Sequence, residues 1–246
     1  MLTVEHLGKT FVSGFGRRVK AVRDVSFHIK AGTTFGLMGN SGCGKTTLSR
    51  MILRLLDSYC GRILFDGQDI TDMGITDRAN LGISFAFQQP VRFKGVQVLD
   101  LLRLAAKKKL SVAEACQYLA EVGLCAKDYI NREVNASLSG GELKRIEIAS
   151  VIARASKLSV FDEPEAGIDL WSFQNLIQVF ERMRQNTNGS ILIISHQERI
   201  LNIADEIVVI ADGRVVNQGP KDEVLPQIMG TASAVDACSK FYETAQ

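Results

Sequence analysis

The sequence lacks long apolar runs, a secretory leader and paired cysteines, and each absence excludes a class of protein. No apolar stretch reaches the ~18 to 20 residues that a membrane span requires, and the first residues hold no apolar signal-peptide core. The cysteines number five, an odd count, and none forms a C-x-x-C pair, which argues against a disulfide framework or a self-contained metal site. We therefore expect a cytoplasmic protein with free thiols and no membrane insertion.

A surplus of charge of one sign is also missing. The 29 Lys and Arg residues nearly balance 27 Asp and Glu residues, which leaves a formal charge of +2. No dominant basic field therefore points to nucleic acid as a partner. The 246 residues are enough for a self-supporting core, because a chain of this size buries roughly 70 to 75% of its unfolded surface.

One glycine-rich stretch organises the rest of the chain. The segment Gly39-Asn40-Ser41-Gly42-Cys43-Gly44-Lys45-Thr46, followed by Thr47, has the spacing of a phosphate-binding P-loop. The apolar run from Thr34 to Met38 predicts a buried strand before it. Apolar residues at helical spacing follow it, namely Leu48, Met51, Ile52 and Leu55.

Each residue type in this stretch suits a phosphate. Gly39, Gly42 and Gly44 permit a close backbone approach, so amide N–H groups and the helix N-terminus surround the anion. Lys45 reaches the terminal phosphates, and the Thr46 hydroxyl is placed to ligate magnesium. The competing interpretation is an ordinary glycine-rich turn with an exposed lysine.

Strand patterns precede the P-loop and follow its helix. Leu2 to Leu7 and Ala21 to Ile29 read as strands, separated by a polar loop from Ser13 to Lys20. Phe11, just before that loop, either stacks on a purine ring or belongs to the core. A short strand from Arg62 to Phe65 follows the helix and ends at a turn signal.

A further strand, Ile83 to Phe87, delivers an amide to its end. Pro90 lacks an N–H and restricts the residue before it, so the strand stops at Gln88-Gln89-Pro90. Gln88 either reaches a metal ion or its bound water, or merely caps the strand.

From Val98 to about Leu124 the pattern becomes helical and indicates an inserted helical subdomain. Ser111 and Glu114 form a capping box. The expected apolar stripe consists of Val112, Ala115, Cys116, Leu119 and Val122.

A second glycine-rich helix start occurs at Leu138-Ser139-Gly140-Gly141-Glu142. Ser139 is a good N-cap, and Gly140 and Gly141 leave the helix N-terminus uncovered for an anion. A second phosphate site is implied, although similar helix starts occur in proteins that bind nothing there.

Two adjacent acids follow the apolar run from Leu158 to Phe161. Beside a P-loop, Asp162 would hold magnesium, and Glu163 would orient and deprotonate the attacking water. The alternative is a carboxylate cluster in a turn. His196, after the buried strand from Ser190 to Ile194, either hydrogen-bonds the terminal phosphate and the water or is structural.

The C-terminal third continues the alternation of helices and strands. A helix from Leu170 buries one apolar face, with Trp171 off the main stripe. Residues 207–216 read as a hairpin, and short helices follow from about Gly219.

Together these motifs resemble the ATP-binding cassette (ABC) family. Gly39 to Thr46 is similar to a Walker A motif, Gln88 to a Q-loop and Leu138 to Glu142 to a signature sequence. Further along the chain, the resemblance covers a Walker B motif at Leu158 to Asp162 with Glu163 as catalytic base, a D-loop at Ala166 to Asp169 and a switch histidine at His196.

The resemblance implies an α/β fold: a P-loop ABC ATPase core with a mixed sheet, an antiparallel β subdomain and an inserted helical subdomain. We expect one domain over residues 1–246, with the helical subdomain at about 90–156 and a helical tail at about 220–246. The implied cofactors are ATP and Mg²⁺. The implied assembly is a nucleotide-dependent head-to-tail homodimer, in which the signature sequence of one copy faces the Walker A motif of the other.

Two branches of the family compete. From Lys20 to Gly67 the chain resembles the ATPase subunits of peptide and nickel importers. Around Gln88 it is similar to the ATPase of the SUF iron-sulfur cluster assembly system, with Gly82, Phe85 to Pro90 and Gly95-Val96 carrying the likeness.

We expect the SUF branch, with a SUF scaffold protein as partner, no nucleic acid and no direct membrane insertion. Glu142 and the following Leu143 to Ile148 also depart from the importer pattern, as do Glu165 and Ile168. Glu165 is unusual for the SUF ATPase too. A chromosome or DNA-repair ATPase is disfavoured, because no long coiled-coil insertion or basic stripe is present.

Overall fold

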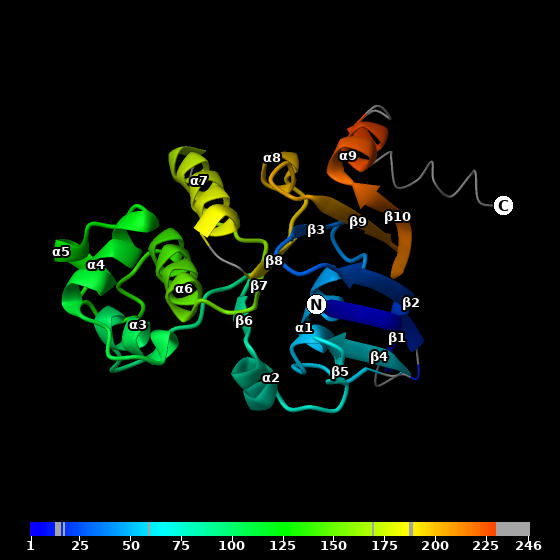
Figure 1. Cartoon of the computed structure of the whole chain (residues 1–246), viewed down its shortest axis with the longest axis horizontal. Coiled ribbons are helices and arrows are strands. Elements are labelled where there is room, and N and C mark those ends of the chain that lie inside the picture. Colours follow the sequence, from blue (N-terminus) through cyan, green and yellow to red (C-terminus); the bar gives the residue numbers. More distant parts are fainter. Residues whose placement is uncertain (13–15, 17, 59, 169, 187–188, 230–246) are drawn as a thin grey trace.

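Two β-sheets frame the molecule, and the smaller one is antiparallel. The computed structural model describes residues 1–12, 16, 18–58, 60–168, 170–186 and 189–229 (Figure 1). In the four-stranded sheet the order is β2-β1-β4-β5. These strands are β1 (Leu2–Val12), β2 (Arg18–Ile29), β4 (Cys60–Phe65) and β5 (Gln68–Asp69).

The larger sheet has six strands in the order β10-β9-β3-β8-β7-β6. They are β3 (Thr34–Met38), β6 (Ile83–Ala86), β7 (Leu158–Asp162), β8 (Ser190–Ile194), β9 (Glu206–Ala211) and β10 (Arg214–Pro220). All neighbours are parallel except β9 and β10. Every residue of β3, β7 and β8 is buried, as expected for parallel strands covered on both faces.

Nine helices are present in the described part of the chain. They are α1 (Lys45–Ile52), α2 (Ile75–Leu81), α3 (Val98–Ala106), α4 (Val112–Glu121), α5 (Ala126–Tyr129), α6 (Gly140–Arg154), α7 (Leu170–Asn186), α8 (Glu198–Leu201) and α9 (Lys221–Met229). None of the helices in the described part of the chain has the length and apolarity to cross a membrane.

Helices α3 to α6 gather beyond β6, on the side away from the antiparallel sheet (Figure 1). Their apolar faces join α7 and the adjoining face of the large sheet in one core cluster, which includes Leu102, Leu119 and Ile146. A second cluster lies between the two sheets and around α1. The large sheet therefore separates two packed layers, and its strand ends lie between them.

The sequence-based element predictions hold with specific exceptions. Val112 does not join the buried stripe, because its side chain is 51% exposed at the first position of α4. β6 ends at Ala86 rather than at Phe87, since its pairing with β7 stops there. The predicted loop from Ser13 to Lys20 is too long, because β2 already begins at Arg18.

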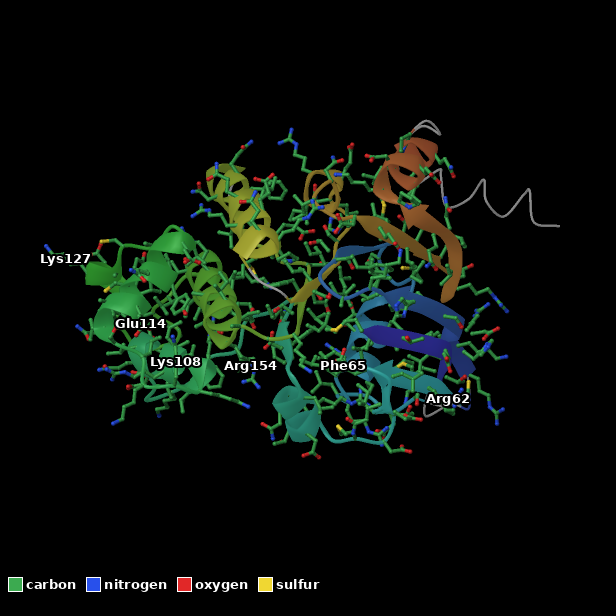
Figure 2. All side chains as sticks on the ribbon, viewed as in Figure 1. Arg62, Phe65, Lys108, Glu114, Lys127 and Arg154 are labelled. Carbon is green, nitrogen blue, oxygen red and sulfur yellow. The ribbon has the colours of Figure 1, made fainter. Side chains whose placement is uncertain are left out.

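Some predictions fall where the structure gives no description. Asp169, the side chain of Trp171, and Cys238 in the predicted tail all lie outside the described residues. Of that tail, α9 is described, and the chain still belongs to β10 at Gly219. The capping box of Ser111 and Glu114 is confirmed, and Figure 2 shows Glu114 near Lys108 at the outer edge of the helical group.

Candidate active site

The P-loop connects β3 to α1 and is pressed against two other strands. A Cβ atom on Gly39 would lie 2.3 Å from the Ile210 carbonyl oxygen, and one on Gly44 would lie 2.3 Å from the Ala21 carbonyl oxygen. Gly44 also has a φ of 111°, which disfavours any residue with a side chain. Neither position therefore accommodates another residue without moving the loop.

Lys45 begins α1 and is 4% exposed. Its ammonium donates to the carbonyl oxygens of Gly39, at 2.6 Å, and of Asn40, at 2.9 Å. The positive charge is therefore held inside the loop formed by Asn40 to Gly44. Gly44 occupies the N-cap position of α1, so no side chain caps the N-terminus of this helix. An uncapped helix start with a buried cation beside it is suited to a phosphate.

The other predicted polar residues converge because the parallel strands end at one edge. β3 leads into the P-loop, β6 into Phe87 and Gln88, β7 into Glu163, and β8 into Ser195 and His196. In open α/β sheets this carboxyl edge is where ligands bind.

A polar cavity of about 360 Å³ lies at this edge. It is lined by Thr46, Arg50, Phe85, Phe87, Gln88, Gln89 and Asp162. The three predicted metal ligands, Thr46, Gln88 and Asp162, are thus brought together.

The buried carboxylate of Asp162 fits a cation. Its Oδ2 accepts a hydrogen bond from the Ser49 hydroxyl at 3.2 Å, whereas its buried Oδ1 has no hydrogen-bond partner in the described structure. Burial raises the pKa of Asp162, so a nearby cation would favour its charged form. Among the described residues no three His, Cys, Asp or Glu side chains converge to hold a metal.

Glu163 directly follows β7 in a left-handed conformation, with a φ of 44°. Its N–H donates to the Ile194 carbonyl of β8 at 2.8 Å, and its Oε2 accepts from the Gln88 amide at 2.7 Å. The backbone of Glu163 is thereby held by β8, and its carboxylate is held by Gln88, which follows β6.

His196 lies beside two carboxylates rather than one. Its Nδ1 is 4.0 Å from Oε1 of Glu163 and 3.9 Å from Oε1 of Glu165. Its side chain is 55% exposed, while Glu165 is buried and accepts a hydrogen bond from the Ser195 hydroxyl. Burial raises the pKa of Glu165. Sequence analysis singled out Glu165 only as a departure from family patterns.

The second glycine-rich element lies elsewhere. Ser139 caps α6 in a reciprocal capping box with Glu142, whose carboxylate also accepts from the Tyr129 hydroxyl at 2.5 Å. That hydrogen bond lowers the pKa of Glu142. A Cβ on Gly140 would meet open space. Because α6 and α1 lie on opposite sides of β6 and β7 (Figure 1), this helix start is separated from the P-loop of the same chain.

Phe11 lies near the end of β1 and is 40% exposed, so it is not a core residue. The Lys9 ammonium lies 5.7 Å from the centre of its ring. Stacking of this partly exposed ring on adenine stays a prediction.

Sequence reasoning missed two buried charges on α6. Lys144 is fully buried, with its ammonium donating to the carbonyl of Phe87, and Glu147 accepts from the N–H of the same residue at 3.0 Å. Burial lowers the pKa of Lys144 and raises that of Glu147 to about 7. The available signal in the sequence was a Lys and a Glu three positions apart on a helix, with Leu143, Ile146 and Ile148 next to them.

Comparison with known proteins places these features in a family. The family model described as ABC transporter matches residues 22–166. An uncharacterized ABC transporter ATP-binding protein of Methanocaldococcus jannaschii, MJ0035, is 36% identical over 82% of this chain and 84% of its own length. The oligopeptide transport ATP-binding protein OppF of Bacillus subtilis is 31% identical over 91% of this chain and 77% of its own.

The fold agrees with solved cassettes. The dimeric structure of MJ0796, a bacterial ABC transporter cassette, has a TM-score of 0.81 at 22% identity and covers 89% of this chain and 98% of that one. A post-hydrolysis state of MJ0796 bound to ADP and phosphate gives 0.80 at 23% identity, with the same coverage. The predicted α/β cassette fold is therefore confirmed. The chain belongs to the ABC transporter family and is an ATPase that hydrolyses ATP with Mg²⁺.

Proposed function

We propose that the strand-end cluster is the hydrolytic site and that Glu163 is its general base. The observation that carries the proposal is the hydrogen bond at 2.7 Å that the amide of Gln88, a residue of the cavity lining, donates to the Glu163 carboxylate. In this role Glu163 takes a proton from the water that attacks the γ-phosphate in line, and His196 supports the geometry by a hydrogen bond. Lys45 neutralises charge that develops on the phosphate oxygens.

The metal would be held by Thr46, Asp162 and, directly or through water, Gln88. A magnesium ion held there would supply positive charge to offset the charge of the phosphate groups. The remaining P-loop residues, Asn40 to Gly44 and Thr47, would form the cradle, with Phe11 against the adenine.

Each nucleotide would lie between two copies of the chain. The support is the separation of the P-loop from Ser139, Gly140 and Gly141, whose helix start is open to an anion. A head-to-tail homodimer with two-fold symmetry brings both elements to each ATP. The solved MJ0796 cassette is itself dimeric. We also propose one ABC domain over 1–246, with a helical subdomain at about 90–156.

The test is the Glu163→Gln substitution. Removing the general base should slow ATP hydrolysis by about 10²-fold or more while ATP binding persists and the dimer accumulates in size-exclusion chromatography. Glu181→Gln, at an exposed position of α7, is the matched control and should hydrolyse ATP like the parent. Turnover unchanged by Glu163→Gln would refute the assignment.

For the partner we propose a SUF-type scaffold protein, which the ATP-driven dimer would reshape during iron-sulfur cluster assembly. The support is the resemblance of Phe85 to Pro90, Gly95-Val96 and Leu143 to Ile148 to the SUF ATPase. Val91 and Phe93, in the same region, are 43% and 41% exposed, which leaves apolar surface for a docked protein.

The second candidate is the ATP-binding subunit of a membrane importer. The names of several relatives favour it: besides OppF, they include a methionine import and a sulfate/thiosulfate import ATP-binding protein. Anaerobic pull-down of the tagged chain from its native cell separates the two. A soluble, β-rich partner supports the SUF proposal, whereas a partner with several spans of ~20 apolar residues overturns it.

A further inference from the structure

The backbone of Phe87, between β6 and Gln88, is held by α6 rather than by the sheet. β6 pairs with β7 through Ala86 and Phe161, and the pairing goes no further. At the next residue the N–H of Phe87 donates to Oε1 of Glu147 at 3.0 Å, while its carbonyl accepts from the Lys144 ammonium. One turn of α6 thus satisfies both main-chain groups of Phe87. We call Lys144, Glu147 and the Phe87 backbone the Phe87 clamp.

The clamp is built from buried charge. The Lys144 side chain is fully buried, and that of Glu147 is 13% exposed, with Nζ and Oε2 3.7 Å apart. Nζ also lies 3.4 Å from the carbonyl oxygens of both Gln88 and Asp162. A buried ion pair is weak evidence for stability, because an apolar pair of similar volume often serves as well. Its presence at this place suits a role in fixing geometry.

The clamp leads directly to the hydrolytic residues. Gln88 follows Phe87, and its side-chain amide donates to Oε2 of Glu163 at 2.7 Å. Toward its N-terminus, α6 begins at Gly140, directly after its N-cap Ser139. α6 therefore carries the second glycine-rich element on its first turn, and farther along the helix Lys144 and Glu147 hydrogen-bond to the residue before Gln88.

We propose that Lys144 and Glu147 are positioning residues, which set the orientation of the Glu163 carboxylate through Phe87 and Gln88 according to where α6 lies. The inference rests on the proposed roles of Gln88 and Glu163. When the start of α6 contacts a nucleotide bound by a second copy, the position that α6 then takes fixes the position of Gln88 through the Phe87 clamp. Hydrolysis then depends on the position of α6, while ATP binding at the P-loop does not, because the clamp touches no P-loop residue in the hydrogen bonds and ion pairs of the described structure.

The experiment measures ATP affinity, kcat and KM for clamp variants of the full-length chain. Glu147→Ala removes the acceptor for the Phe87 N–H, and Lys144→Met removes the donor while keeping the length of the side chain. Each should lower kcat by about tenfold or more, with the Kd for ATP changed less than about threefold. Lys157→Met is the control, because it removes an exposed lysine paired with Asp66 at 2.9 Å and should match the parent.

A double-mutant cycle tests whether the effect passes through Gln88. In a Gln88→Ala background, Glu147→Ala should lower kcat less than twofold further. Full additivity, or an unchanged kcat in either clamp variant, overturns the inference. If Glu147→Ala does not fold, Glu147→Gln replaces it in the test. This variant keeps an acceptor oxygen for the Phe87 N–H and loses the charge, so it should retain more than half of the parental kcat. A kcat as low as that of Lys144→Met overturns the role of that hydrogen bond. Failure of the hydrolytic assignment would appear separately, as normal turnover in Glu163→Gln.

Discussion

Arg78 offers the sharpest test of how the P-loop helix is anchored. This residue of α2 is 1% exposed, and its guanidinium donates to carbonyls at the end of α1 and in the loop before α2. The acceptors are Met51, Ile52, Ile70, Thr71 and Met73, at 2.5 to 3.0 Å. Burial lowers the pKa of Arg78 to about 10, so the side chain remains charged at neutral pH. Replacement with Met keeps much of its stem and removes every donor.

The expected loss of stability follows from what the carbonyls retain. The Met51, Ile70 and Thr71 oxygens keep another donor, supplied by Arg54 or by the Met73 N–H. The loss therefore falls on the Ile52 and Met73 carbonyls, at about 1 to 3 kcal/mol for each buried group left without a partner. Part of this loss of stability is offset, because folding of the variant no longer requires burial of a charged guanidinium. We expect Arg78→Met to reduce the free energy of unfolding by about 3 kcal/mol.

Urea unfolding gives this free energy, and thermal unfolding gives a second value. For a domain of this size ~3 kcal/mol corresponds to a fall in Tm of about 6 to 12 °C. Arg62→Met is the control: its surface pair with Glu5, at 2.9 Å, is worth about 0 to 1 kcal/mol. Both proteins are compared without nucleotide, because ATP stabilises the folded state by binding. A loss below about 1 kcal/mol for Arg78→Met, or equal losses in the two variants, would refute the reasoning.

Three further predictions concern the P-loop and one helix start. Lys45→Ala should weaken ATP binding by about tenfold or more in equilibrium titration, and equal affinity in variant and parent would contradict the cradle. Gly44→Ala should also weaken binding by about tenfold or more, because its Cβ would meet the Ala21 carbonyl at 2.3 Å; Gly67→Ala, at φ 81° with open space around it, controls for backbone strain and should leave affinity unchanged. The Glu114 carboxylate, held by hydrogen bonds from Ser111 and from Lys108, should titrate near pH 2 by carbon-13 NMR. Its ionised form therefore stabilises the start of α4 above about pH 4.5, and that stabilisation is lost as the pH falls toward 2. A titration midpoint near 4.5 would contradict this stabilisation.

The predictable part of the site consists of short motifs at strand ends. Gly39 to Thr46, Asp162-Glu163 and His196 each follow a run of apolar residues, so their strands could be recognised and their polar residues assigned to one sheet edge. Their convergence then follows from parallel pairing, which the structure has in the order β3-β8-β7-β6.

The unpredicted part depends on partners distant in sequence. Arg78 bonds to backbone carbonyls, which leave no mark on the sequence, and the pairing of Glu147 with Phe87 spans 60 positions. Val112 was misplaced for a different reason: helical spacing assigned it to the stripe, but at the first position of α4 it lies beyond the packed neighbours of Ala115 and Leu119. Periodicity identifies a face, and tertiary packing decides where that face ends.

The strand order also has a consequence during synthesis on the ribosome. β3, which carries the P-loop, lies between β8 and β9, and its partners begin at Ser190 and Glu206. A nascent chain that already contains Gly39 to Thr46 has no strand neighbours for β3 until β8, which begins at Ser190, has been synthesised. The P-loop is also held by the Gly213 N–H, which donates to the Cys43 carbonyl at 2.9 Å. The P-loop therefore acquires its packing partners only after Gly213 has been synthesised, and we expect nucleotide to be captured after that point rather than when Gly39 to Thr46 first emerges.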